Sequence, residues 1–104
     1  MSDSMIPYSP RERRFARPRF GSLRDHLLAE IDALALELEE AGDATASGRV
    51  PIAARTDYLR ARDAHHRAAI AWMAATSRDD LTIVSDALRQ CRTALEASRA
   101  LLRR

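Results

Sequence analysis

Residues 81–102 read LTIVSDALRQCRTALEASRALL, and their spacing decides the fold class. Apolar or small side chains recur at alternating intervals of three and four residues: Leu81, Val84, Leu88, Cys91, Leu95, Ser98 and Leu102. This heptad period places them on one face of an α-helix, as in helical bundles and coiled coils. Ser77, followed three residues later by Asp80, matches a capping box. The pattern predicts a long C-terminal helix over residues 78–102.

An earlier segment, residues 23–41, carries the same period. Its apolar stripe consists of Leu27, Ile31, Leu34, Leu38 and Ala41. Ser22 is expected to cap the start of this helix, and Gly42 is expected to end it in a left-handed conformation. Residues 43–55 are expected to form a loop, with residues 50–52 folded over one end of the core.

The middle helix, expected over residues 55–75, is less clearly patterned. The heptad period gives it a core-facing stripe and a second stripe one residue earlier. The first stripe is Leu59, Asp63, His66, Ile70 and Met73, and the second is Tyr58, Arg62, His65, Ala69 and Trp72. Residues 68–75, AAIAWMAA, contain no charged side chain and leave no face for water. We expect this run to contact a second copy of the chain, unless its small alanines simply lie in water.

Together these segments predict an all-α fold: a three-helix antiparallel bundle, made of a helical hairpin and a long coiled-coil-like C-terminal helix. The chain divides into an extended basic arm over residues 1–21 and a bundle over residues 22–104. An antiparallel hairpin is expected to place Arg55, Arg60 and Arg62 beside Glu37, Glu39 and Glu40. The bundle is expected to form a homodimer. The predicted interface residues are Ile70, Trp72, Met73, Leu95 and Leu102.

Composition limits the class of protein. The chain has 104 residues and a net charge of +2, and all 17 of its basic residues are arginine. The abundance of Ala and Leu favours helices. A single cysteine excludes an intrachain disulfide and fits a reducing compartment. The longest apolar run, residues 68–75, is far shorter than the ~20 residues of a membrane span. We therefore expect a cytoplasmic protein without a membrane partner.

The N-terminal arm combines positive charge with aromatic rings. The residues concerned are Arg11, Arg13, Arg14, Phe15, Arg17, Arg19 and Phe20. Arginines can follow a phosphate backbone while aromatic rings stack on bases, which would give a nucleic-acid-associated protein. The same residues also suit an acidic protein partner, or a tail that packs on an apolar surface.

Two pairs of residues have the chemistry of a small site. Asp63 and His66 lie three apart on one predicted helix, and His26 and Glu30 lie four apart on another. Such pairs can bind a metal ion in a bundle or act as an acid and a base. However, the antiparallel hairpin places His26 level with about residue 69, which is six residues or about 9 Å from Asp63.

No cofactor is expected from the sequence. It contains no phosphate-binding glycine loop, and Cys91 occupies a core position. We therefore expect a non-enzymatic protein–protein interaction or regulatory module that self-associates through the middle helix. The alternatives are a nucleic-acid-associated protein that uses the arm, and a small helical enzyme or metal protein that uses Glu30, Asp63, His65 and His66.

Overall fold

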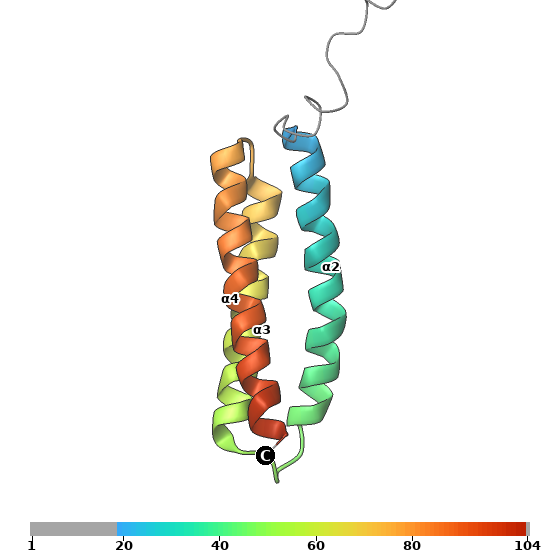
Figure 1. Ribbon diagram of the computed structural model, residues 1–104, viewed down its shortest axis with the longest axis vertical. Helices are drawn as coiled ribbons and strands as arrows, with labels where there is room; N and C mark the ends of the chain where they lie inside the picture. Colours follow the sequence, from blue (N-terminus) through green and yellow to red (C-terminus); the bar gives the residue numbers. More distant parts are fainter. Residues whose placement is uncertain (1–18, 104) are drawn as a thin grey trace, which may run out of the picture.

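The computed structural model describes residues 19–103, which form three α-helices (Figure 1). They are α2 (Phe20–Thr45), α3 (Ile52–Ala74) and α4 (Arg78–Leu102). Each helix runs antiparallel to the one before it, so α2 and α4 point the same way. The predicted all-α, three-helix antiparallel bundle is confirmed. No helix within the described range is long and apolar enough to cross a membrane.

The core lies where the heptad stripes of α2 and α4 face α3. All five predicted core positions of α2 are buried. In α4 the six positions from Leu81 to Ser98 are buried, and Leu102, near the end of the helix, is half-buried. Ser98 keeps its hydroxyl satisfied by donating a hydrogen bond to the carbonyl oxygen of Ala54, 2.8 Å away. Both stripes are therefore confirmed.

The core-facing stripe of α3 differs from the predicted one. Its fully buried residues are alanines: Ala54, Ala61, Ala64 and Ala68. Three larger, half-buried side chains lie between them at intervals of seven residues: Tyr58, His65 and Trp72. Because alanine lets two helix backbones approach closely, α3 packs most tightly against α4. The predicted core stripe was wrong: Asp63, His66, Ile70 and Met73 are exposed.

Two ring nitrogens of α3 fix its register against α2. Trp72 Nε1 donates to the carbonyl oxygen of Arg24 at 2.7 Å. One heptad earlier, His65 Nε2 lies 2.8 Å from the carbonyl oxygen of Ile31. Since a carbonyl only accepts, this nitrogen carries the proton. Both contacts join residues whose numbers add to 96, as a regular antiparallel pair requires. The same sum places His26 level with residue 70, one residue from the predicted position 69.

Arg24 strengthens the same contact from the other side. Its guanidinium carbon lies 3.7 Å from the centre of the Trp72 ring, in a cation–π arrangement. Its Nη2 also donates to the Trp72 carbonyl oxygen at 3.2 Å. Because that carbonyl lies in the last turn of α3, the positive charge also opposes the negative end of the helix dipole. Arg24 and Trp72 therefore hold the upper ends of α2 and α3 together.

Ion pairs set the register between the parallel helices α2 and α4. Glu30 pairs with Arg92, and Glu37 pairs with Arg99 at 2.9 Å. The two glutamates are seven residues apart, and so are the two arginines. The two ion pairs therefore define the same offset between α2 and α4. The predicted pairing of acidic α2 residues with Arg55, Arg60 and Arg62 was wrong. Arg55, for instance, donates to the Thr45 carbonyl at the end of α2.

The helix ends match the prediction only in α4. Ser77 accepts a hydrogen bond from the backbone N–H of Asp80 at 3.2 Å, as a cap should. By contrast, α2 begins at Phe20, before Ser22, and continues through Gly42 without a positive φ. Gly42 instead provides space: a Cβ added there would lie 2.7 Å from the hydroxyl oxygen of Tyr58.

Candidate interaction surface

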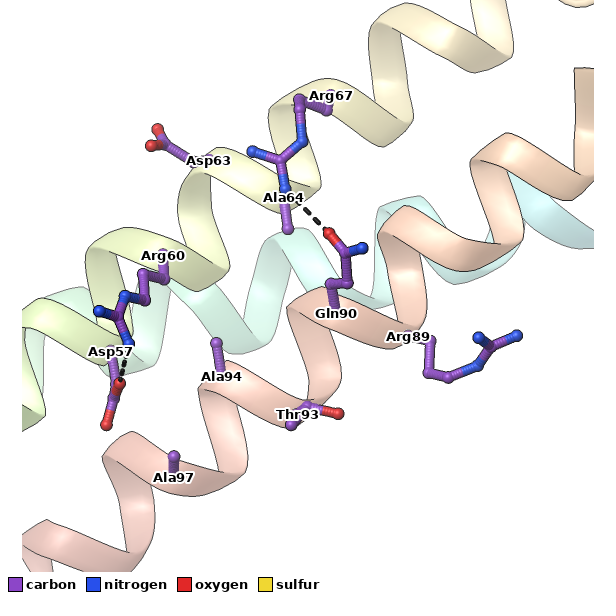
Figure 2. A pocket seen from close by; sticks show the side chains of 10 residues that line it. All are labelled: Asp57, Arg60, Asp63, Ala64, Arg67, Arg89, Gln90, Thr93, Ala94 and Ala97. Carbon is purple, nitrogen blue, oxygen red and sulfur yellow. Dashed lines mark hydrogen bonds and ion pairs between the residues drawn. The ribbon is translucent and has the colours of Figure 1, made fainter.

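A shallow groove follows the outer side of the α3–α4 hairpin (Figure 2). Its volume is about 560 Å³. Its lining residues include three alanines, Ala64, Ala94 and Ala97, and charged or amide side chains whose long stems border these alanines. The groove is therefore open to solvent and lined by both small and charged residues.

The charged residues around the groove are only partly paired within one chain. Arg60 lies 3.6 Å from Asp57, and Arg67 donates to the side-chain oxygen of Gln90 at 3.0 Å. In Figure 2 the Asp63 carboxylate points away from both arginines. No hydrogen bond or ion pair joins it to any other residue between 19 and 103. Among residues 19–103, Asp63 therefore has no cationic partner.

Large apolar side chains extend this surface at both ends. Ile70 is 49% exposed and lies one heptad after Asp63, while Ile83 is 61% exposed and lies one heptad before Gln90. The heptad period places both on the faces that line the groove, nearer the turn between α3 and α4. At the other end of α3, Ile52 is 85% exposed, so the expectation that it folds over the core was wrong.

The exposed residues of α3 form a continuous stripe of their own. We call it the outer α3 stripe, and it consists of Ile52, Thr56, Arg60, Asp63, Arg67, Ile70 and Ala74. All seven are exposed, and intervals of three or four residues place them on one helical face. The outer α3 stripe differs from the stripes predicted from the sequence, in which Asp63 and Ile70 faced the core.

The predicted interface residues differ in how exposed they are. Ile70 and Met73 are exposed, and Met73 is 67% exposed, so both remain candidates. Leu95 is buried inside the bundle, and Leu102 is half-buried. The half-buried Trp72 is held by Arg24 and packs against the core. The prediction needs correction for Leu95, because its side chain is already covered within one chain, and stays a prediction for the other four residues.

The candidate metal and acid–base residues do not come together. His26 Nε2 lies 3.4 Å from Glu30, whose other oxygen pairs with Arg92. His66 and Asp63 are exposed on α3, and His65 is hydrogen-bonded to the carbonyl oxygen of Ile31 in α2. No group of three or more His, Cys, Asp or Glu side chains suited to a metal ion occurs in the described part of the chain. Between residues 19 and 103, the candidate metal and acid–base side chains therefore do not form one cluster.

Cys91 has the properties of a core residue. Its side chain is fully buried, and burial raises the pKa of the thiol above its ordinary value. A raised thiol pKa keeps the sulfur protonated near neutral pH and suppresses its nucleophilicity. The expectation that Cys91 is a packing residue therefore has a physical basis in its surroundings.

Most of the predicted arm lies outside the described residues. This holds for Arg11, Arg13, Arg14, Phe15 and Arg17. Arg19 is exposed and precedes the first residue of α2, but Phe20 begins α2 and packs against the core. Phe20 therefore has to be removed from the arm, because its ring already contacts the chain's own apolar residues. The nucleic-acid alternative stays a prediction.

Comparison with known proteins gives no assignment, since no family model, curated protein or solved structure matches this chain.

Proposed function

We propose that this chain is a small, non-enzymatic helical interaction module that self-associates through the outer face of α3. The observation that carries the proposal is the exposure of three large apolar side chains on α3: Ile52 and Ile70, which belong to the outer α3 stripe, and Met73, which flanks it. Apolar side chains gathered on one side of a small bundle are typical of a protein contact surface.

Ile83 supports the same surface from the neighbouring helix. It is exposed near the turn of the hairpin, on the side of α4 that lines the groove. Leu36 is also exposed, but it lies on α2, away from this surface. An apolar contact face that spans two adjacent helices favours a helical partner, since another helix can lie along both. A second copy of the hairpin provides such a helix.

Light scattering across a range of concentrations tests the proposal on the full chain. We expect a mass near twice the 11.6 kDa of one chain at high concentration, falling toward one chain on dilution. The double variant Ile70→Gln with Ile83→Gln is expected to weaken association at least about tenfold, because burying an isoleucine contributes about 1.5–3 kcal/mol.

Leu36→Gln provides the matched control. Leu36 and Met73 are both 67% exposed, but Leu36 lies on α2. The control is expected to associate like the wild type, and circular dichroism checks that all variants keep their helices. A mass of one chain at every concentration, or equal effects of the α2 and α3–α4 variants, would show that the proposal is wrong.

A further inference from the structure

The outer α3 stripe has apolar side chains toward its two ends and charged side chains of both signs at its centre. Isoleucine lies near each end, at Ile52 and Ile70, and Arg60, Asp63 and Arg67 lie between them. All these side chains are exposed, and none belongs to the buried core. A helical face of this kind can meet a copy of itself only if each charged residue avoids a like charge on the other copy.

From this order we infer that two copies pack with their outer α3 stripes antiparallel, centred between Ala61 and Arg62. The inference rests on the proposed self-association and adds to it the direction and register. In this register Ile52 faces Ile70 of the second copy, and Thr56 faces Arg67. Arg60 faces Asp63 of the second copy, and the two-fold axis repeats each of these contacts.

The number of residues between the contacts supports one register. The numbers of the facing residues add to 122 for Ile52 and Ile70, and to 123 both for Thr56 with Arg67 and for Arg60 with Asp63. One antiparallel register therefore fits all of these contacts. The intervals along the stripe are three and four residues, as helix pairs with interlocking side chains require. Met73, which flanks the stripe, comes close to the height of Ile52 of the second copy and enlarges the apolar end layer.

A parallel arrangement of the same stripe is disfavoured by charge. It would place Arg60 beside Arg60, Asp63 beside Asp63 and Arg67 beside Arg67. Like charges that face one another across an interface oppose association, whereas the antiparallel register turns the central layers into Arg–Asp pairs. The Asp63 carboxylate, which has no partner within the described part of one chain, is paired in this way with Arg60 of the second copy.

The cost of releasing Arg60 from its own chain is small. Its distance to Asp57 is 3.6 Å, and its side chain is 73% exposed. An exposed pair at that distance contributes little, since water and salt screen it. Arg60 can therefore turn toward Asp63 of a second copy without loss of a strong intrachain contact.

Charge reversal in the full chain tests the register. The variant Arg60→Asp sets a new carboxylate against Asp63 of the second copy twice per dimer, and Asp63→Arg sets a new guanidinium against Arg60 twice. Each variant alone is expected to associate at least about tenfold more weakly than the wild type. Mixed in equal amounts, the two variants are expected to associate more strongly than either alone. In the predicted register, both contacts between positions 60 and 63 of the heterodimer set a carboxylate of one chain against a guanidinium of the other. 

A second rescue is the double variant Arg60→Asp with Asp63→Arg in one chain. In the predicted register this exchange restores an opposite-charge pair in both central layers, so the double variant is expected to dimerise within about threefold of the wild type. Native mass spectrometry measures the dimer fraction of all three variants at matched concentrations.

Two control reversals lie off the stripe. Arg62→Asp changes an exposed arginine of α3 that is not part of the stripe, and Asp32→Arg changes an exposed aspartate of α2. Both are expected to keep wild-type association. If the wild type dimerises but the double variant stays as weak as the single ones, or if either single variant still dimerises like the wild type, the register is wrong and self-association stands. A wild type that remains a single chain overturns both.

Discussion

The contact between Arg24 and Trp72 gives the most detailed prediction for stability. Trp72→Phe keeps a ring against the core but removes the indole N–H that donates to the Arg24 carbonyl at 2.7 Å. It also weakens the cation–π contact, in which Arg24 lies 3.7 Å from the ring centre. A hydrogen bond of this kind contributes about 0.5–1.5 kcal/mol, and a partly exposed cation–π contact contributes about 0.5–1 kcal/mol. We therefore expect the free energy of unfolding to fall by about 1–2.5 kcal/mol.

Urea denaturation followed by far-ultraviolet circular dichroism measures this loss. All variants should be compared at one protein concentration, because self-association adds to the apparent stability. For a domain of this size, each 1 kcal/mol corresponds to a shift of about 4–8 °C in Tm. The exposed substitution Leu36→Met is the control and is expected to change stability by less than about 0.5 kcal/mol.

A double-mutant cycle separates the two parts of the contact. Arg24→Met removes the guanidinium but keeps the carbonyl that accepts from Trp72. The coupling between Arg24→Met and Trp72→Phe therefore reports the cation–π contact alone and is expected to be about 0.5–1 kcal/mol. If Trp72→Phe leaves stability within about 0.5 kcal/mol of the wild type, then this contact does not hold α2 against α3.

Three further predictions follow from the core and the helix ends. Ala61→Leu adds volume at a fully buried position between closely packed helices and is expected to cost about 1–3 kcal/mol in thermal denaturation, whereas Ala29→Leu on the exposed face of α2 is expected to change little. Hydrogen bonds from Thr76 to the Asp80 carboxylate lower its pKa in the folded state. This stabilisation is present above the ordinary carboxylate pKa of 3.8 and is lost as the pH falls through the lowered value, so the stability difference between wild type and Asp80→Asn should disappear in acid. The Cys91 thiol is expected to react with a disulfide reagent in urea but hardly at all in the folded protein, and rapid labelling of the native chain would contradict its burial.

The sequence predicted α4 and the core of α2 well because leucine, isoleucine and valine mark their buried faces. In α3 the same reasoning placed Ile70 and Met73 in the core, where the chain has Ala61, Ala64 and Ala68. Alanine gives a weak pattern, since it fits both a core and a surface. Its burial here depends on the close approach of α4, which is a property of the tertiary structure and is not encoded in α3 alone.

The outer α3 stripe was not predicted for the same reason, because Asp63 and Ile70 had been assigned to the core. Once Asp63 and Ile70 are placed outside, the intervals of the outer α3 stripe are visible in the sequence. The partners of the glutamates show a different limit. Glu30 and Glu37 pair with α4, because the parallel packing of α2 and α4 brings their heptads together. That offset between two helices distant in sequence follows from side-chain packing and not from local spacing.

Disulfide trapping between copies tests the central claim most directly. Two variants of the full chain, Ile52→Cys and Ile70→Cys, are oxidised mildly, each alone and as a mixture, and separated on a non-reducing gel. In the antiparallel register, residue 52 faces residue 70 of the second copy, but two copies of residue 52 lie about 27 Å apart along the helices. A disulfide needs Cα atoms within about 7 Å. The account therefore predicts linked dimers in the mixture and none in either single-variant sample. Linked dimers in the single-variant samples, or no linked dimer in the mixture, would contradict it.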